Sequence, residues 1–375
     1  MLKTILKLLL SKVTPLVTNC DNSILSLGDY YDLFCGYYDV SPFSHCSKFL
    51  CVHGRNIDCD VVDILVINIE KKEFFVIDST SAWNYQQGAR LTWFAEDELI
   101  YNRYSEESDS YVSIIKNVKT LEERIIPYPV QTFFKDQFIL SIDYCHLTDV
   151  GSEYGYKCQY LSNRRKDLIF YDTNTGEAEV LFSIDDCFHQ LKNEYQTSRR
   201  AHINHFLINT TGDYFIFLFR FYEEGRRIDN LFGYCLKEKS IELLLENEVI
   251  SHCSWRDDVE FVFWGIVDDV AGYYMFSIID RKLILKVSTN QDGHPTFLTH
   301  NVILTDTYPN KFLQQELYTL DVETKNRKLI CTKRHPAFYS IDRRCDFHPS
   351  VSKQIDRFQI DILDNGRRKV CIGMI

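Results

Sequence analysis

The amino-acid sequence predicts an all-β fold, a seven-bladed β-propeller. Short apolar runs separated by turn residues recur in sets of four, and each set spans roughly 50 residues, a repeat length typical of propeller blades. Tyrosine and phenylalanine are abundant, with 23 and 26 copies, as in other strand-rich proteins. No linker rich in proline, serine or glycine interrupts the repeats, so we expect one domain over residues 21–375.

The first three repeats each contain four expected strands. Their ranges are 36–42, 49–52, 63–68 and 74–78; 87–93, 98–102, 111–115 and 123–126; and 130–134, 138–143, 167–171 and 178–182. The third repeat carries an insertion at 146–165, which contains Glu153-Tyr154-Gly155-Tyr156.

A helix is expected at 184–194, and four further repeats follow it. Their strand ranges are 202–206, 214–220, 231–236 and 241–245; 251–255, 260–264, 272–278 and 282–287; 292–297, 302–309, 316–320 and 327–331; and 344–349, 354–361 and 368–375. The last repeat lacks a strand. We expect residues 29–35 to supply it, so that N- and C-terminal strands pair and close the propeller without exposed sheet edges.

The N-terminal segment predicts a short amphipathic helix within residues 1–20. Leucine and isoleucine recur there at helical spacing and lysines interrupt the apolar run, unlike a signal peptide. A lid packed on the domain is favoured over a membrane-surface or partner-docking role. No apolar stretch is long enough for a transmembrane segment.

Charge and cysteine content indicate which partners and which cellular compartment suit this protein. The net charge is −11, which argues against a nucleic-acid partner because phosphate contacts need a basic face. The 13 cysteines show no C-x-x-C spacing. So many unpaired thiols favour a reducing, cytoplasmic location.

Histidines recur where consecutive repeats begin. Similar positions in four repeats are occupied by His205, His252, His294 and His348, and His202 lies beside the first of them. His252 and His294 are 42 residues apart, and His294 and His348 are 54 residues apart. The first strand of a blade lines the propeller axis, so such residues can meet at one site. The alternative is that these polar entries satisfy neighbouring backbone groups or shape turns.

The last repeat suggests a metal site. Alternate residues of a strand share one face, so Arg344, Asp346 and His348 should point the same way. Asp346 and His348, together with His294, suit a divalent metal such as Mn²⁺, Zn²⁺ or Fe²⁺. Tyr308 is expected near the same mouth.

Several motifs resemble TolB-like seven-bladed propellers related to oligogalacturonate lyases. They are the segment 82–90, Asp292-Gly293-His294-Pro295, the segment 304–309, and the segment 344–349. The resemblance implies a metal that binds a uronate carboxylate, a histidine base in an earlier blade, and an assisting arginine. His294 and His348 match the metal blades and His252 matches the base. The lyases' last blade offers a glutamine and two histidines, whereas this chain has Arg344, Asp346 and His348.

The resemblance implies β-elimination on a uronate-containing saccharide. His252 or His205 would remove the proton, Tyr308 would donate to the leaving oxygen, and a metal or arginine would neutralise the carboxylate. The assisting arginine is Arg220, Arg226 or Arg227. The saccharide is expected to contact Gln87, Arg90, His202 and Arg344. The alternative is a non-catalytic propeller that binds a glycan or a protein in cytoplasmic polysaccharide metabolism.

Overall fold

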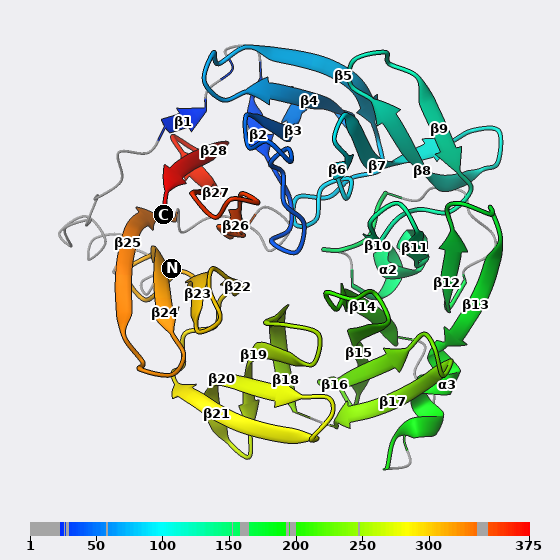
Figure 1. Ribbon diagram of the computed structural model, residues 1–375, viewed down its shortest axis with the longest axis vertical. Coiled ribbons are helices and arrows are strands. Elements are labelled where there is room, and N and C mark those ends of the chain that lie inside the picture. The colour runs from blue at the N-terminus through cyan, green and yellow to red at the C-terminus, as the bar shows by residue number, and fades with distance from the viewer. Residues whose placement is uncertain are drawn as a thin grey trace. The chain divides into compact units, whose positions relative to one another are not determined.

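The computed structural model describes residues 23–25, 27, 30–57, 59–151, 153–157, 165–192, 195, 200–246, 248–335 and 344–375. The expected N-terminal helix lies outside these residues. The described strands form seven four-stranded sheets, the blades of a β-propeller (Figure 1). The predicted seven-bladed all-β fold is therefore confirmed. The chain separates into two compact units, residues 1–99, 117–121 and 291–375, and residues 100–116 and 122–290.

Three sheets lie wholly within the first unit. In sheet order they are β1 (Ser23–Leu25), β28 (Arg367–Met374), β27 (Arg357–Asp364) and β26 (Ser350–Val351); β2 (Asp32–Phe34), β3 (Phe49–Arg55), β4 (Val62–Asn68) and β5 (Phe74–Thr80); and β22 (Thr296–Phe297), β23 (Val302–Asp306), β24 (Gln314–Asp321) and β25 (Arg327–Arg334).

Three other sheets lie wholly within the second unit. They are β10 (Thr132–Phe134), β11 (Phe138–Ser141), β12 (Asp167–Asp172) and β13 (Ala178–Ser183); β14 (His202–Ile208), β15 (Tyr214–Glu223), β16 (Arg226–Cys235) and β17 (Ser240–Leu245); and β18 (Val249–Trp255), β19 (Glu260–Val267), β20 (Val270–Ser277) and β21 (Lys282–Ser288). The seventh sheet comprises β6 (Thr92–Ala95), β7 (Glu98–Ser105), β8 (Ser110–Asn117) and β9 (Glu123–Ile126).

Two short helices complete the described secondary structure. α2 (Tyr144–Val150) begins two residues before the insertion of the third repeat and continues into it, and the helix expected at 184–194 is α3 (Ile184–Gln190). Asp143 and Ser183 cap their N-termini by accepting backbone N–H bonds. No described helix has the length and apolar character needed to cross a bilayer.

Terminal strands pair as predicted, but through a different segment. β1 pairs with β28, with Leu25 opposite Val370, so the N-terminal partner is 23–25 rather than 29–35. Residues 32–34 instead form β2, which pairs with β3 and begins the first blade. Both segments are short and apolar, so their local pattern does not say which sheet each one joins.

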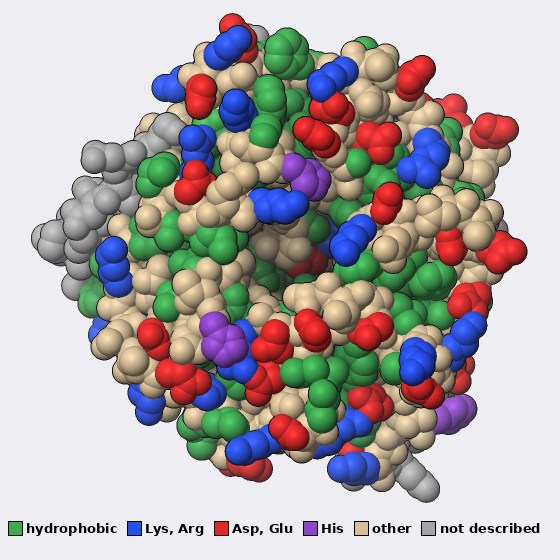
Figure 2. Space-filling model, in the orientation of Figure 1, with side chains coloured by type: hydrophobic (Ala, Val, Ile, Leu, Met, Phe, Trp, Pro, Cys, Tyr) green, Lys and Arg blue, Asp and Glu red, His purple; other side chains and the backbone are tan. Residues whose placement is uncertain are grey.

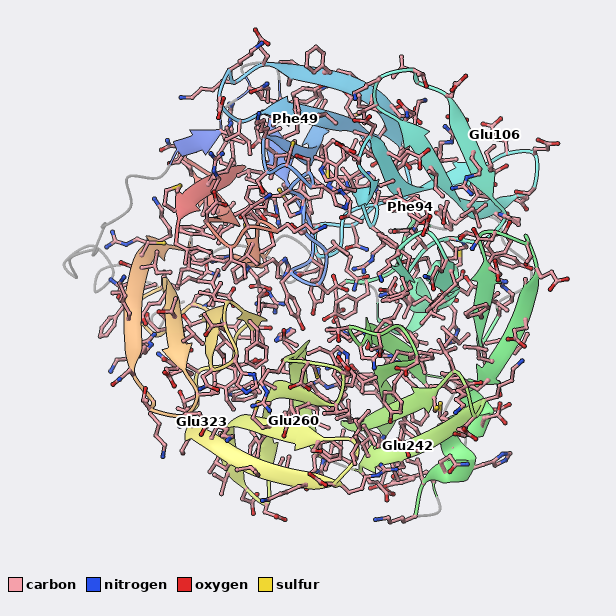
Figure 3. The ribbon with its side chains drawn as sticks, viewed as in Figure 1. Phe49, Phe94, Glu106, Glu242, Glu260 and Glu323 are labelled. Atoms are coloured by element: carbon pink, nitrogen blue, oxygen red, sulfur yellow. The ribbon has the colours of Figure 1, made fainter. Side chains whose placement is uncertain are left out.

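Apolar side chains of the strands build the blade cores, and polar residues occupy the turns. Eight successive residues of β15, from Tyr214 to Phe221, are buried. Figure 3 labels Phe49 of β3, and also Glu106 and Glu323, which lie in turns between neighbouring strands. Figure 2 shows acidic and basic side chains interspersed over the viewed face, without a large basic patch there.

Candidate functional site

Three predicted metal ligands meet in the first unit. Single ligand atoms of His294, Asp346 and His348 all lie within 4.8 Å of one another. All three residues are at most 3% exposed. Two ligand atoms about 2.1 Å from one ion are separated by at most about 4.2 Å, so only a small closure would let these atoms coordinate one cation. Imidazole and carboxylate ligands suit Zn²⁺, Mn²⁺ and Fe²⁺, so the donor set fits a divalent metal.

Asp306, at the end of β23, fixes the orientation of His294. Its carboxylate accepts the His294 backbone N–H at 2.7 Å and lies 2.9 Å from the ring Nδ1. A carboxylate on one ring nitrogen is the usual partner of a metal-binding histidine. Gly293 permits this approach, since a Cβ atom there would lie 1.9 Å from the Asp306 carbonyl oxygen.

The orientation of His348 is fixed by a backbone carbonyl group rather than by a carboxylate. Its Nδ1 lies 2.9 Å from the Gly36 carbonyl oxygen, which selects the tautomer with hydrogen on Nδ1. Its φ of 45° is uncommon for a residue with a side chain and often marks a functional position. The ring lies 4.5 Å from that of His294, at an interplanar angle of 87°.

Arg344 and Tyr308 lie beside the same cluster. The Arg344 Nε donates to Asp346 at 2.7 Å, and its side chain is 35% exposed. Its guanidinium lies 5.0 Å from the Tyr308 ring centre, and that ring is 5.9 Å from the ring of His294. The cluster therefore contains an arginine and a phenol as well as metal-binding groups.

Sequence reasoning missed several residues of this cluster. Tyr37 packs against His348 with ring centres 4.8 Å apart, and Tyr38 against His294 at 5.2 Å. Asp306 was visible in the segment 304–309, but its role depends on hairpin register. The Gly36 carbonyl gave no signal at all, because any residue carries one.

His205 and His252 lie in the second unit, each at a β-bulge. The register between β14 and β15 shifts between Asn204 and Leu207, and that between β18 and β19 shifts between Ile250 and Cys253. Each bulge inserts one extra residue and re-aims its side chains. The two imidazole ring centres are 6.0 Å apart. The Ser251 hydroxyl lies 2.9 Å from the Nδ1 of His252 and orients that ring.

Arg220 and His202 are cross-strand neighbours in this unit. Arg220 lies on β15, is 5% exposed, and donates to the Ile250 carbonyl at 3.0 Å. Its Nε is 3.3 Å from Asp229. These contacts brace the strand that leads into Ser251 and His252, so Arg220 positions that segment.

Two predicted saccharide contacts of the first unit are buried. Arg90 is 1% exposed and forms a bidentate ion pair with Asp39 at 2.8 and 2.9 Å, which explains its burial without a ligand. Gln87 is also 1% exposed, and neither polar atom of its amide has a hydrogen-bond partner within the described part of the chain. Both residues stay predicted saccharide contacts, and the ion pair with Asp39 also gives Arg90 a structural role.

Two further histidines are buried, His53 in β3 and His146 in α2. The Ala89 backbone N–H donates to His53 Nε2 at 3.0 Å. Burial lowers the pKa of His53 to about 4, so this ring is a neutral structural acceptor.

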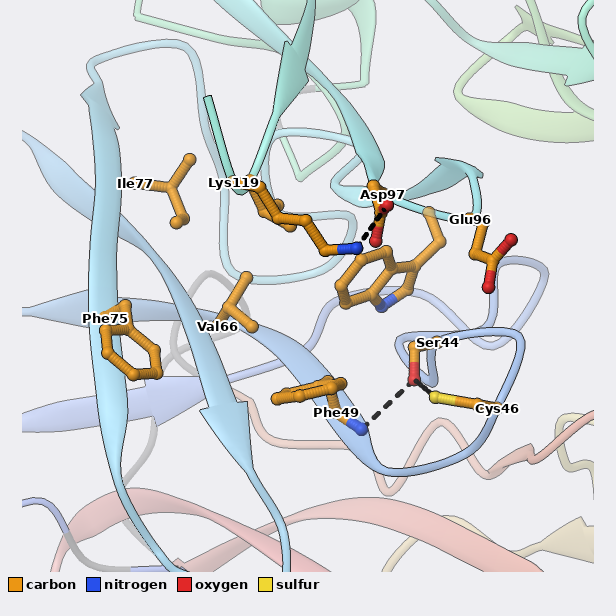
Figure 4. A pocket seen from close by; sticks show the side chains of 11 residues that line it. Ser44, Cys46, Phe49, Val66, Phe75, Ile77, Glu96, Asp97 and Lys119 are labelled. Atoms are coloured by element: carbon orange, nitrogen blue, oxygen red, sulfur yellow. Dashed lines mark hydrogen bonds and ion pairs between the residues drawn. The ribbon is translucent and has the colours of Figure 1, made fainter. Parts of the chain in front are cut away.

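A mainly apolar cavity of about 360 Å³ lies in the first unit (Figure 4). Phe49, Val66 and Phe75 line it, and the exposed Cys46 lies at its edge. A hydrogen bond with the Ser44 hydroxyl lowers the pKa of the Cys46 thiol. None of the predicted site residues lines this cavity.

No protein-family model and no curated protein matches the sequence. The structure is similar to that of an oligogalacturonate lyase from Vibrio parahaemolyticus, with a TM-score of 0.67, 15% identity, and 96% of this chain and 94% of that chain covered. It is also similar to an oligogalacturonate lyase in complex with manganese, with a TM-score of 0.69 and 13% identity over 96% of this chain and 97% of that chain. The similarity to the tricorn protease has a TM-score of 0.54 and 9% identity, over 89% of this chain and 33% of that chain. The resemblance to propellers related to oligogalacturonate lyases is therefore confirmed at the level of the fold.

Proposed function

We propose that this protein is a metal-dependent lyase that cleaves a uronate-containing saccharide by β-elimination. The observation that carries the proposal is the pair of buried imidazoles beside Asp346, His294 and His348, whose Nδ1 atoms face fixed oxygen atoms. This arrangement assigns Nε2 of each ring to the cation. An oligogalacturonate lyase of the same fold is solved in complex with manganese, which supports a divalent metal in this protein.

The proposed chemistry divides among named groups. When bound, the metal would neutralise the substrate carboxylate and so lower the barrier to removing the proton on the adjacent carbon. Arg344, partly exposed, would hold the same carboxylate. Tyr308 would protonate the leaving oxygen as the carbon–oxygen bond breaks and a carbon–carbon double bond forms. We assign proton removal to His252, with His205 as the second candidate, because a neutral imidazole accepts a proton near pH 7.

We also propose a cytoplasmic setting. Ten cysteines among the described residues are free thiols, which supports a reducing compartment. Cys145, by contrast, is in a disulfide, so the redox state of the purified protein is a direct check.

A non-catalytic glycan-binding protein is the second candidate. The ion pair between Arg344 and Asp346 favours it, because the guanidinium already neutralises this buried carboxylate without a metal. In that case Arg344 and the surrounding tyrosines would bind an acidic sugar, and no bond would break.

Metal analysis and an absorbance assay separate these functions. Purified protein loaded with Mn²⁺ should retain one equivalent of metal and generate the ultraviolet absorbance of an unsaturated uronate. His294→Ala should abolish metal retention, and His252→Ala should lower the rate by about 10²–10⁴-fold. His300→Ala, at an exposed turn of the first unit, is the matched control. Retained metal with no absorbance across a panel of uronate oligosaccharides would exclude the lyase.

A further inference from the structure

Arg344 contacts the carboxylate oxygen of Asp346 that the proposed metal would need. Its Nε donates to Oδ2 of Asp346 at 2.7 Å. The same oxygen, Oδ2, is 3.9 Å from Nε2 of His348, the ring nitrogen assigned to the cation. Two ligand atoms of one ion are at most about 4.2 Å apart, so Oδ2 and Nε2 already have a suitable separation. The guanidinium and the cation would therefore bind the same atom.

Burial makes it unfavourable for two cations to share this oxygen. The side chains of Asp346 and His348 are 0% and 2% exposed. Solvent and salt screen buried charges much less than exposed ones. Asp306 supplies a second negative charge, but it contacts Nδ1 of His294, whereas Nε2 is the proposed ligand atom of that ring. A divalent ion and a guanidinium on Oδ2 would therefore repel each other strongly.

The side chain of Arg344 can leave Asp346 while its backbone stays in place. The side chain is 35% exposed, so it has room to turn toward solvent. Its guanidinium is also 5.0 Å from the ring centre of Tyr308, a favourable contact for a cation that does not depend on Asp346. The Arg344 carbonyl accepts a hydrogen bond from the guanidinium of Arg368, which is 3% exposed. This buried contact holds the main chain, and only the side chain has to move.

We propose that Arg344 competes with the metal for Asp346, so that the guanidinium must leave Oδ2 before the cation can bind. In the metal-free protein Arg344 neutralises a buried carboxylate that would otherwise destabilise the fold. The same contact lowers the affinity of the centre, and only a cation that binds oxygen and imidazole ligands tightly can displace it. The inference rests on the metal centre of the proposed function, but not on the lyase reaction.

Calorimetric titration of Mn²⁺ into the metal-free, full-length protein tests this competition. Arg344→Met should lower the Kd for Mn²⁺ by roughly tenfold or more, because it removes the competing charge and adds no oxygen or nitrogen ligand. Arg344→Lys keeps a positive charge beside Asp346 and should stay within about threefold of the wild type. Thermal unfolding gives a second measurement: Mn²⁺ should raise the Tm of Arg344→Met more than that of the wild type, because tighter binding stabilises the native state more.

Arg327→Met is the matched control. Arg327 belongs to the same unit, and its side chain is 37% exposed. Its guanidinium pairs with Glu316 at 2.5 Å and lies 3.8 Å from the ring centre of Tyr318. Arg327 thus resembles Arg344 in exposure and in its kinds of contact, but its carboxylate partner lies outside the proposed metal centre. Arg327→Met should change the Kd for Mn²⁺ by less than about twofold.

Several results would overturn the competition. These are a Kd for Mn²⁺ that is unchanged or higher in Arg344→Met, equal Kd values for Arg344→Met and Arg344→Lys, and no binding of Mn²⁺ by any variant. Binding by Arg344→Met without binding by the wild type would support it, since the arginine then excludes the metal completely. The lyase is judged separately, by ultraviolet absorbance, so either proposal can fail while the other stands.

Discussion

Asp361, on β27, is a buried carboxylate that supports the candidate metal centre through the backbone next to His348. Its oxygen atoms accept the backbone N–H groups of Cys35 at 3.0 Å and Gly36 at 3.4 Å. Its own N–H donates to the Phe347 carbonyl at 2.8 Å. Gly36 in turn holds the His348 ring, so Asp361 fixes both segments that position this imidazole.

Asp361 also gives the protein a specific pH dependence. Burial raises its pKa to about 7, from an ordinary value of 3.8, although Arg368 and the backbone donors oppose the shift. The native state therefore binds more protons than the unfolded state between about pH 4 and pH 7. This group's contribution to stability falls as the pH rises through that window.

Asp361→Asn should remove that pH dependence. The free energy of unfolding of the wild type, relative to the variant, should decrease from pH 4 to pH 7 and then level off. Urea denaturation of both proteins at several pH values measures this difference and cancels the other titrating groups. A difference that rises with pH would show that Asp361 is ionised at acidic pH in the folded protein.

At the scale of elements, one residue holds the insertion of the third repeat. The Asp143 carboxylate accepts the N–H groups of Cys145 at 2.8 Å and His146 at 3.2 Å, which caps α2. It also accepts the Arg165 N–H at 2.7 Å, where the chain returns toward β12. Asp143 thus ties together both ends of this insertion.

Asp143→Ala should therefore cost more stability than the loss of an N-cap alone. Loss of an N-cap costs about 0.5–2 kcal/mol. Ser183→Ala removes the equivalent cap from α3, which has the same length, and should cost an amount within that range. Asp143→Ala should cost more, because it also removes the acceptor of the Arg165 N–H. Urea denaturation measures both variants, and equal losses would show that Asp143 acts only as a helix cap.

At the scale of the whole molecule, the repeats were predictable because strand alternation and turn residues are local signals. The spacing of His294 and His348 placed them at equivalent entries. Asp346 was expected from strand periodicity over 344–349, but these residues form no strand: the strand is β26, Ser350–Val351, and loop geometry brings Asp346 and His348 together. Their supports were not predictable: Gly36 holds His348 across 312 residues, and a backbone carbonyl leaves no trace in composition. Arg90 shows a second limit of sequence reasoning. Its position at the start of a repeat resembles that of a ligand-binding residue, but in the structure it is buried and paired with Asp39.

The terminal pairing gives a prediction for the stability of the whole chain. Leu25 is 3% exposed and packs with Leu33, Val370 and Ile372, which joins β1 to the C-terminal sheet. Leu25→Ala should therefore lower the free energy of unfolding by about 2–5 kcal/mol, through lost burial and the cavity left behind.

The adjacent residue provides the control for that prediction. Ile24 belongs to the same strand but is 41% exposed, so Ile24→Ala should change stability by only about 0.5 kcal/mol. Urea denaturation followed by tryptophan fluorescence measures both variants. A small effect of Leu25→Ala, equal to that of Ile24→Ala, would mean that β1 contributes no buried contact and leaves β28 as an exposed edge. A large difference between them would show that residues 23–25 complete the last blade.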